Sequence, residues 1–482
     1  MTLMDSRDDI PLLVVDLDGT LIRSDTLFEC FWAALAESGR TIPVCLRALG
    51  RGRAALKRDL AALGPIDAAH LPYNEVVVEH IRDWRARGGR AVLVSAADQS
   101  IADRVAAHLG LFEAAHGSDG VRNLKGPQKA AMIAETYGAA PHAYLGDSLS
   151  DLPVWAGAQR AITVDASAGL RRRLESAGAQ AEHLRTTTGT GTLQGYVAAL
   201  RPHQWLKNLL VFVPMIAAHA TQPAVMMQAV LAFVAFCLVS SAGYVLNDLM
   251  DLRADRMHPR KARRPLASGR VPIGHGTAMV PVLLLAGLGL AMLGGGALLA
   301  IIAGYFALTV TYSLWLKRRA IADICTLAGL YTMRILAGGL ATGLVPSVWL
   351  LAFSMFFFVA LAAIKRQAEL VDLFGRGRPA TERRGYTVED LPVVRQVAVA
   401  SGYVSVLVLA LYLDAPAVQQ LYGAPWLLWG ICFVLLYWIT RIALITSRGG
   451  MDDDPIVFAL RDRTSLLCLA LMGGFVTGAA LL

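Results

Sequence analysis

The sequence predicts two domains of different fold class. Residues 1–190 are expected to form an α/β domain with a doubly wound parallel sheet and a small helical cap, and residues 200–482 an all-α membrane domain of nine transmembrane helices. The first prediction rests on short apolar strands that alternate with helical segments and end in polar residues. The second rests on composition, because 55% of the residues are hydrophobic and only 17% are charged. From Trp205 onward, the apolar residues form runs long enough to cross a bilayer.

The first predicted strand, in PLLVVDLDGTL, ends in two aspartates. Asp16 and Asp18 are two residues apart, so their side chains project to the same side of the strand end. Gly19 follows them and lets the backbone turn closely around a ligand. This pattern indicates a binding site at the end of the strand.

Three further segments of the same domain carry polar residues at strand or helix ends. Ser95 follows a second apolar strand, in AVLVSAADQ, and Lys129 begins a helix, in LKGPQKAAMI. Asp147 and Asp151 follow another strand, in AYLGDSLSDLPVWAGA. Open parallel sheets build their sites from polar residues at the carboxyl ends of strands, so these side chains are expected to share one site. Lys125 is the other candidate for the lysine, and the spacing favours Lys129.

These four elements, in this order, resemble the haloacid dehalogenase-like phosphatase superfamily over about residues 10–185. The resemblance implies that Asp16 is the nucleophile that accepts a phosphoryl group and that Asp18 is the general acid and base. Residues 25–88 are expected to form a cap that controls which phosphate enters. A domain of the same fold without activity is the alternative. The implied phosphate-binding residues are Ser95 and Lys129, and the implied Mg²⁺ ligands are Asp16, Asp18, Asp147 and Asp151.

Nine apolar segments of about 20 residues are expected to cross the membrane. The loops between them alternate, because those on one side carry no Lys or Arg while those on the other are basic. The positive-inside rule therefore places the N-terminal domain in the cytoplasm and the C-terminus outside, in an inner membrane. The first ten residues are acidic and have no apolar core, so we expect no secretory signal. The segments centre near Val213, Ala235, Leu285, Ala307, Gly329, Met355, Val406, Val434 and Met472.

An acidic cluster lies at the end of the second apolar segment, in NDLMDLRADRMHPRKARRPLASG. On a helix, Asp248 and Asp255 would point within about 20° of each other, with Asp251 beside that face. Oxygen ligands so arranged suit Mg²⁺ bound together with substrate phosphates, and the basic residues that follow suit phosphate oxygens. The alternative is a solvated loop whose positive charges set the topology. The candidate metal ligands are Asn247, Asp248, Asp251 and Asp255, and the candidate phosphate-binding residues are Lys261 and Arg264.

From Arg201 to the end, the sequence resembles the UbiA-type intramembrane prenyltransferase superfamily. The resemblance is carried by RPHQWLKN at residues 201–208, by the NDxxDxxxD element, and by YSLWLKRRAIADICTLAGLYTMRILAGG. It implies nine helices around a central cavity, with a Mg²⁺–diphosphate site on the cytoplasmic side. Lys207 and Lys317 lie in these stretches and are candidate phosphate-binding residues.

One segment departs from the pattern of that superfamily. Its aromatic prenyltransferases carry a second aspartate-rich motif after the sixth helix, whereas this chain has KRQAELVDLFGRGRPATERRGYTVEDL. Lys365, Glu369 and Asp372 would share a helical face, and Arg366 adds a second positive charge. Acids beside bases suit two phosphorylated substrates, so Lys365 and Arg366 are candidate phosphate-binding residues. This segment and DDDPIVFALRDR, at residues 452–463, resemble the branch that transfers phosphoribose to a polyprenyl phosphate.

Two ionisable residues fall inside the fifth apolar segment. Asp323 and Arg334 are eleven residues apart, hence on nearly the same helical face and about 16 Å apart along the axis. A charge within a bilayer is costly and indicates a functional site. We therefore include Arg334 among the candidate phosphate-binding residues, with a structural ion pair as the alternative.

Composition argues against other classes of site. The six cysteines are scattered, with no CxxC and no His/Cys cluster, so neither disulfides nor zinc are expected. The formal net charge is +8, but the basic residues lie in the loops between apolar segments. That distribution is typical of membrane topology and anionic ligands rather than of nucleic-acid binding.

The joint presence of both motif sets indicates a Mg²⁺-dependent bifunctional membrane enzyme. The leading hypothesis is transfer of phosphoribose from phosphoribosyl diphosphate to a polyprenyl phosphate such as decaprenyl phosphate, with the fused phosphatase removing the 5-phosphate. The first alternative is a prenyltransferase that moves a polyprenyl chain from its diphosphate to an aromatic or other small acceptor. A transporter or lipid-binding protein, and a soluble domain that is only regulatory, are two further alternatives.

Overall fold

The computed structural model describes residues 12–138, 140–178, 181–186, 191–375, 377, 385–451 and 455–482. Two compact units are present: the first combines Met1–Arg201 with Tyr244–Pro281, and the second combines Pro202–Gly243 with Val282–Leu482. The acidic cluster after the second apolar segment therefore belongs to the same unit as the α/β domain. Residues 452–454 of the motif at 452–463, and 376 and 378–384 of the loop after Lys365, lie outside the described residues.

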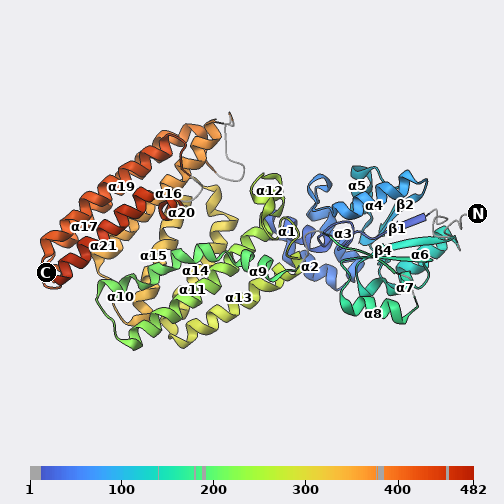
Figure 1. The fold of residues 1–482 in the computed structure, drawn as a ribbon, viewed down its shortest axis with the longest axis horizontal. Helices are drawn as coiled ribbons and strands as arrows, with labels where there is room; N and C mark the ends of the chain where they lie inside the picture. The colour runs from blue at the N-terminus through green and yellow to red at the C-terminus, as the bar shows by residue number, and fades with distance from the viewer. Residues whose placement is uncertain are drawn as a thin grey trace, which may run out of the picture. The chain divides into compact units, whose positions relative to one another are not determined.

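The first unit contains a six-stranded parallel sheet with the order β3-β2-β1-β4-β5-β6. Figure 1 labels its central strands β1, β2 and β4. In the middle of this sheet, Val15 of β1 pairs with Leu93 of β2 and with Leu145 of β4. The carboxyl ends of these three strands therefore lie at one edge, as expected for a parallel sheet that builds a site there. The strands are β1 (Leu12–Val15), β2 (Arg90–Asp98), β3 (Ala114–Ser118), β4 (His142–Gly146), β5 (Arg160–Val164) and β6 (Ala181–Leu184).

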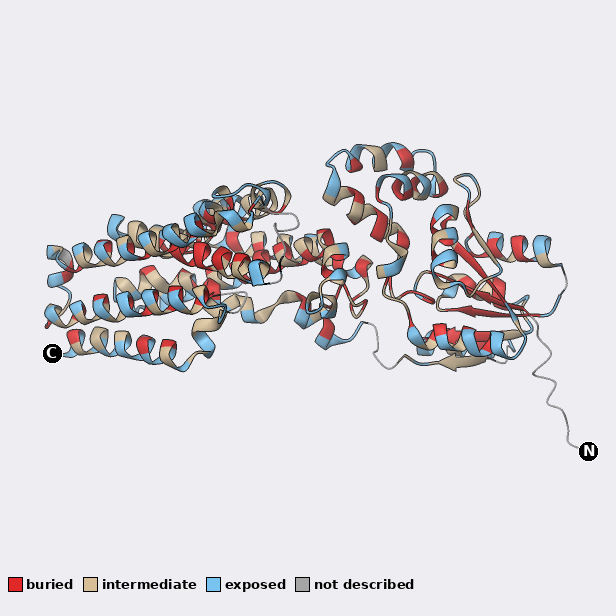
Figure 2. Cartoon of the chain, turned by 90° about the horizontal axis from the view of Figure 1, so that it is seen from above, coloured by how far each residue is buried: buried red, intermediate tan, exposed pale blue. Residues whose placement is uncertain are grey.

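Both faces of the sheet are covered, which confirms the doubly wound prediction. Alternate residues of β1 enter separate cores: Leu13 and Val15 join one cluster, and Leu12 and Val14 join the other. The central strands β1, β2, β4 and β5 are mostly buried, whereas the edge strand β6 is half-buried; the sheet is largely coloured as buried in Figure 2. The covering helices are α4 (Glu75–Ala86), α5 (Gln99–Leu109), α6 (Pro127–Tyr137), α7 (Leu152–Trp155) and α8 (Ala168–Ser176).

Three short helices between β1 and α4 form a small cap, which is shorter than the predicted residues 25–88 because α4 packs on the sheet. The first begins at Asp25, whose carboxylate accepts hydrogen bonds from the amides of Leu27 and Phe28 and so satisfies donors at the helix start. Buried Cys30 and Leu60 join the cap to the core on one face of the sheet. The cap elements are α1 (Thr26–Glu37), α2 (Thr41–Leu49), α3 (Arg53–Leu63) and the 3-10 turn η1 (Ala68–His70).

Among the described residues, eight helices are long and apolar enough to cross a membrane. They coincide with eight of the nine expected segments, so the chain is an integral membrane protein with several spans. The spans are Pro223–Met250, Ile273–Leu293, Gly296–Leu314, Ala322–Thr342, Val348–Gly375, Val388–Leu413, Pro425–Ser447 and Arg463–Leu481. They contain α11 (Pro223–Met250), α13 (Ile273–Leu293), α14 (Gly296–Leu314), α15 (Ala322–Thr342), α16 (Val348–Gly375), α17 (Leu391–Leu413), α19 (Trp429–Ser447) and α21 (Arg463–Leu481).

The segment expected to centre near Val213 is not a long α-helix. It forms the 3-10 helix η3 (Pro202–Phe212) followed by the short α10 (Val213–Ala217). A 3-10 helix rises about 2.0 Å per residue and an α-helix about 1.5 Å, so the two together extend about 30 Å. This length is comparable to the hydrocarbon thickness of a bilayer, which accounts for nine predicted segments and eight long helices.

The remaining elements are short. They are α9 (Leu193–Leu200), α12 (Leu252–Met257), α18 (Pro416–Gln419), α20 (Pro455–Arg461), η2 (Leu149–Asp151), η4 (Lys261–Arg263), η5 (Leu316–Arg318), η6 (Val388–Asp390) and η7 (Pro425–Leu428).

Close backbone packing within the second unit depends on a glycine in α15. A Cβ atom at Gly338 would lie 1.9 Å from the carbonyl oxygen of Val211 in η3. Any larger residue at position 338 would therefore force η3 away from α15. Gly329 on the same helix offers a contrast, because a Cβ there meets nothing within 4 Å.

We predict that Gly338→Ala lowers the free energy of unfolding by about 3 kcal/mol, because overpacking against backbone cannot be relieved by a rotamer change. The matched variant Gly329→Ala is expected to be neutral or stabilising by up to about 1 kcal/mol, since alanine is the better helix former. Thermal unfolding of both variants in detergent tests this, and equal melting temperatures would contradict the packing argument.

Candidate active sites

The carboxyl ends of β1 and β4 bring three carboxylates together. Asp16 follows β1, Asp147 follows β4, and Asp151 ends η2. One oxygen from each lies within 4.8 Å of the others. Three hard oxygen ligands at this spacing fit a divalent cation such as Mg²⁺. Within the part of the chain that the structure describes, this is the one group of three or more acidic, His or Cys side chains with such geometry.

The loop after β1 passes close to Asp147 at Gly19, and only glycine fits there. The φ of Gly19 is +75°, in the left-handed region, and a Cβ atom there would lie 2.3 Å from Asp147 Oδ2. Thr20 then donates a hydrogen bond to Asp147 Oδ1 at 3.3 Å. The Gly-Thr pair of the first motif thus positions an acid that follows a different strand.

Lys129 lies at the centre of this acidic group. It sits in the first turn of α6, and its Nζ is 2.7 Å from Asp16 Oδ1 and 3.7 Å from Asp151 Oδ1. The Tyr144 hydroxyl accepts from Lys129 at 2.9 Å and donates to Asp151 at 2.9 Å. The structure thus brings Lys129 to the acids, whereas the Lys125 side chain is exposed. Tyr144 lies inside an apolar strand and was not identified from the sequence.

Two half-buried carboxyls of the site have raised pKa values. Burial, followed by the charges of Asp16 and Asp151, raises the pKa of Asp147 to about 8. Burial, followed by the charge of Asp25, raises the pKa of Asp18 to about 7. Asp18 also accepts hydrogen bonds from Thr26, from the amide at 2.8 Å and the hydroxyl at 3.1 Å. Such crowding of acids is what a bound cation relieves.

Ser95 lies in β2, beside β1, and is fully buried. Its hydroxyl oxygen accepts a hydrogen bond from the amide of Ala97 at 3.0 Å. The hydroxyl thus lies toward the carboxyl end of β2, at the same edge as Asp16.

The cap adds Lys57, which sequence reasoning missed. This residue lies on α3, and its Nζ donates to the carbonyl of Ala96 at 2.5 Å and to Asn123 Oδ1 at 2.9 Å. Lysines are common on the solvent-facing side of amphipathic helices, so no sequence signal distinguishes Lys57 from an ordinary surface lysine.

The acidic cluster after the second apolar segment, at residues 247–255 and here called the transferase motif, forms an ion-pair network in the first unit. Arg264 Nη1 lies 3.0 Å from Asp248 Oδ1 and 2.6 Å from Asp255 Oδ2. Arg264 therefore bridges the two aspartates, which lie on two successive helices, α11 and α12. Arg201 forms a second ion pair with Asp248. Burial raises the pKa of Asp255 to about 6, although Arg264 acts in the opposite direction.

Arg201 was also missed as a site residue, although it opens the RPHQWLKN stretch. Its φ is +54° and its ψ 60°, in the left-handed region, and Pro202 follows it. A non-glycine residue in this conformation is strained and often marks a functional position. Its guanidinium also lies over the Tyr244 ring, 5.5 Å from the centroid.

The other candidate residues of this segment lie next to the network along the chain. Asn247 is half-buried on α11, Asp251 precedes α12, and Lys261 begins η4. The amide of Asp255 donates to the carbonyl of Asp251 at 2.8 Å, which continues the helical turn between the two acids.

A buried ion pair joins the cap to this acidic segment within the first unit. Arg256 of α12 donates to Glu29 of α1 from Nη1 at 3.0 Å and from Nη2 at 2.5 Å. Its Nε donates to the carbonyl of Ala267 at 3.0 Å. Both charged side chains are less than 10% exposed. Arg256 is adjacent to Asp255, so the cap helix supports the turn that carries this acid.

Three helices of the second unit share a second buried network. Asp323 of α15 is ion-paired with Arg366 of α16 and accepts a hydrogen bond from the Tyr312 hydroxyl of α14 at 2.6 Å. Arg366 also pairs with Glu369, one turn later on α16. The mixed-sign segment therefore pairs internally, and Asp323 is partnered by Arg366 rather than by Arg334 in these contacts.

Arg334 forms hydrogen bonds with three neutral groups. Its guanidinium donates to Asn208 Oδ1, the Tyr305 hydroxyl and the Leu330 carbonyl, at 2.5 to 2.8 Å. It also lies over the rings of Tyr305 and Tyr331, with centroid distances of 4.9 and 5.4 Å. These contacts join η3, α14 and α15, which favours a packing role beside the predicted phosphate role.

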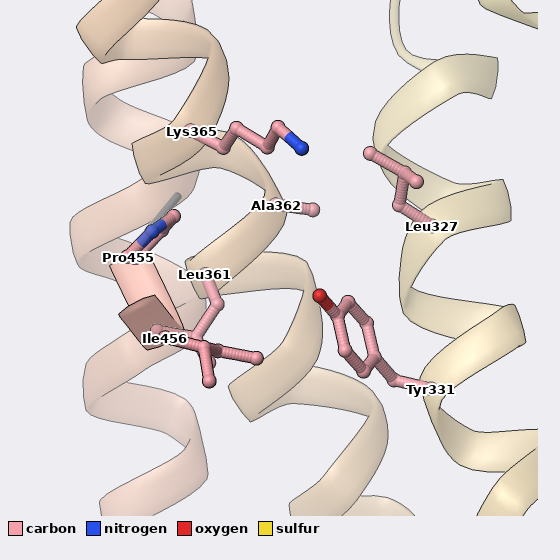
Figure 3. A pocket seen from close by; sticks show the side chains of 7 residues that line it. All are labelled: Leu327, Tyr331, Leu361, Ala362, Lys365, Pro455 and Ile456. Atoms are coloured by element: carbon pink, nitrogen blue, oxygen red, sulfur yellow. The ribbon is translucent and has the colours of Figure 1, made fainter. Parts of the chain in front are cut away.

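A small pocket lies between α15, α16 and α20. Figure 3 shows Lys365 and Tyr331 reaching from facing helices toward the same space. Buried Lys207 lies with its Nζ 5.8 Å from the centroid of the Tyr331 ring. Lys317 lies in η5 and is half-buried. The pocket is lined by Leu327, Tyr331, Leu361, Ala362, Lys365, Pro455 and Ile456.

The model of the UbiA prenyltransferase family matches residues 208–460, more than half of the 482 residues. The chain belongs to the UbiA prenyltransferase family. A second model, for haloacid dehalogenase-like hydrolases, matches residues 13–155. This UbiA protein is therefore an enzyme that combines a membrane transferase domain with a hydrolase domain of the phosphatase type, as the sequence predicted.

Three relatives are similar to this chain over different shares of its length. The uncharacterized protein y4nM of Sinorhizobium fredii is 38% identical over 95% of this chain and 89% of its own length. The nodulation protein NoeC of Azorhizobium caulinodans is 39% identical over 57% of this chain and 89% of its own length. A decaprenyl-phosphate phosphoribosyltransferase of Mycobacterium tuberculosis is 32% identical over 62% of this chain and 98% of its own length.

We predict that the affinity of this UbiA protein for Mg²⁺ at the Asp16–Asp147–Asp151 group rises with pH. Below its pKa of about 8, Asp147 is mainly protonated and must release a proton before it can bind a metal. Apparent affinity should therefore increase roughly tenfold or more between about pH 6.5 and about pH 8.5. Calorimetric titration of the metal-free full-length protein measures this, with Asp147→Asn as the control that lacks the dependence. A constant affinity would contradict it.

We predict that Glu29→Gln destabilises the first unit by about 3 kcal/mol, because Arg256 would stay buried without a counter-ion. Arg253 and Asp67 give the matched control, since they are 3.9 Å apart and Arg253 is 56% exposed. Arg253→Ala should change stability by less than about 0.5 kcal/mol. Equal shifts of the melting temperature in the two variants would argue against a buried ion pair.

Proposed function

We propose that this chain transfers 5-phosphoribose from phosphoribosyl diphosphate to a polyprenyl phosphate such as decaprenyl phosphate, and then removes the 5-phosphate. The observation that carries the proposal is the mixed-sign segment of α16. Lys365, Arg366 and Glu369 occupy the place after the sixth apolar segment. The aromatic prenyltransferases that this chain resembles carry a second aspartate-rich motif there. Cations beside acids suit a lipid monophosphate together with a second phosphorylated substrate. The similarity to the phosphoribosyltransferase of M. tuberculosis supports this choice.

In the proposed transfer, an oxygen of the lipid phosphate attacks C1 of the ribose, and the bond from C1 to the diphosphate breaks. Asn247, Asp248, Asp251 and Asp255 would hold Mg²⁺, which when bound offsets the charge of the diphosphate. Arg264 and Lys261 donate hydrogen bonds to the leaving diphosphate. When the diphosphate binds, Arg264 leaves Asp248 and Asp255 and contacts phosphate oxygens instead. We assign Lys207, Lys317, Arg334 and Arg366 to the same task of stabilising phosphate charge.

The pocket beside Lys365 suits the lipid substrate. Its lining is mainly aliphatic, with one ammonium and one phenol, so it can contact a hydrocarbon chain and a phosphate together. We therefore assign Lys365 to the phosphate of the polyprenyl phosphate.

In the proposed hydrolysis, the Asp16 carboxylate attacks the phosphorus of the 5-phosphate, and O5 of the ribose leaves with a proton from Asp18. Water then attacks the aspartyl phosphate with Asp18 as the base, releasing inorganic phosphate and restoring Asp16. Ser95 and Lys129 hold the phosphate oxygens, and Asp16, Asp147 and Asp151 would hold Mg²⁺, whereas Asp18, also predicted as a ligand, lies outside this group and is assigned the proton transfer. The basic loops support a cytoplasmic N-terminal domain, an external C-terminus and an inner-membrane location.

Mass spectrometry of lipids tests this proposal. Membranes containing the wild-type protein, phosphoribosyl diphosphate and decaprenyl phosphate should yield lipid-linked ribose. Asp16→Asn should accumulate the 5-phosphorylated lipid, with dephosphorylation slowed roughly thousandfold or more, and Asp248→Ala should form neither lipid. If active wild-type membranes formed no lipid-linked ribose but prenylated an aromatic acceptor from a polyprenyl diphosphate, the prenyltransferase alternative would replace this proposal.

A further inference from the structure

The cap places a cation at the edge of the sheet that carries the phosphatase site. Lys57 of α3 reaches the carbonyl of Ala96, the residue after Ser95, at 2.5 Å. The hydroxyl of Ser118 donates to the same carbonyl at 2.8 Å. Lys57 is thus anchored next to a candidate phosphate-binding residue, although it comes from a different part of the chain.

The charge of Lys57 is not neutralised by its contacts. Its ammonium donates to two neutral oxygens, those of Ala96 and Asn123, and no carboxylate oxygen lies within 4 Å of it among the described residues. An ammonium has three N–H groups, so one donor remains. Lys129 differs, because it is ion-paired with Asp16 and Asp151.

A partly buried ammonium without a counter-ion is unfavourable. Burial accordingly lowers the pKa of Lys57, while the charges of Asp18 and Asp25 oppose that change. An anion that contacts the remaining N–H would recover the lost solvation, and the position of Lys57 puts such an anion beside the phosphoryl site.

A second lysine lies near the first. Asn123 contacts Lys57 through its side chain and accepts from the amide of Lys125 through its carbonyl, at 2.8 Å. The Lys125 side chain is exposed and close enough for its charge to act on Lys57. Two cations that repel each other without a shared acid fit an anionic ligand.

We propose that Lys57 and Lys125 form a second anion subsite, which binds a phosphodiester of the phosphatase substrate while its phosphomonoester lies at Asp16. This inference rests on the proposed function, because the lipid-linked 5-phosphoribose carries a monoester at C5 and a diester at C1 of one sugar. The subsite makes the cap select the lipid-linked substrate over free ribose 5-phosphate, which has no diester.

Paired substrates test the subsite in the full-length protein. The first is the isoprenyl phosphodiester of ribose 5-phosphate, and the second is ribose 5-phosphate itself. Phosphate release from the diester should lose roughly ten- to a hundredfold in kcat/KM in Lys57→Met and less in Lys125→Met, mainly through KM. Hydrolysis of ribose 5-phosphate should stay within about threefold of wild type, and Lys57→Arg should restore part of the selectivity.

Arg53→Met is the matched control, since it removes a charge from an exposed position of the same helix and should alter neither substrate. Equal losses on both substrates in Lys57→Met would show a structural tether and overturn the subsite. Unchanged selectivity in Lys125→Met, whose exposed side chain is not needed for folding, would also overturn the assignment of Lys125. Failure of wild type to hydrolyse either substrate would instead reject the proposed phosphatase function, and the subsite with it.

Discussion

A carboxylate that leaves water must be compensated by a cation, a proton or a metal, and both candidate sites depend on how this is done. In the phosphatase site, Lys129 compensates Asp16 and Asp151, while Asp147 and Asp18 are left to proton or metal. The sheet creates this crowding, because parallel strands bring the acids that follow them to one edge. The elevated pKa values follow from the same packing.

The acids of the transferase motif are compensated differently. Arg264 bridges Asp248 and Asp255, and Arg201 contacts Asp248 as well. These arginines hold the carboxylates close together, and a phosphate ligand would offer the arginines equivalent oxygen partners. Glu29 adds support from outside the motif, because its ion pair with Arg256 fixes the helix next to Asp255. The cap of the hydrolase domain is therefore also part of the surroundings of the transferase motif.

The second unit keeps its charges in pairs that join helices. Asp323, Arg366 and Tyr312 connect α15, α16 and α14, and Arg334 connects η3 to its neighbours through Asn208 and Tyr305. Glycine at position 338 permits the close approach of η3 that places Asn208 beside Arg334. A buried polar network is unfavourable if some of its members lack hydrogen-bond partners. The helices must therefore pack closely enough for every member to reach its partner.

The sequence by itself determined the order of the motifs, the parallel sheet and the acids at its strand ends. It also determined the eight long apolar helices found among the described residues. These features depend on local periodicity and on residues close together in the chain. Only the tertiary structure decided the partners: Lys129 lies against Asp16, 113 residues away, and Lys57 reaches β2 from the cap. Local spacing also could not show that the segment centred near Val213 forms a 3-10 helix and a short α-helix, or that Gly338 of a distant helix packs against Val211. Side-chain partners are fixed by packing between elements, and one-dimensional spacing carries no information about that packing.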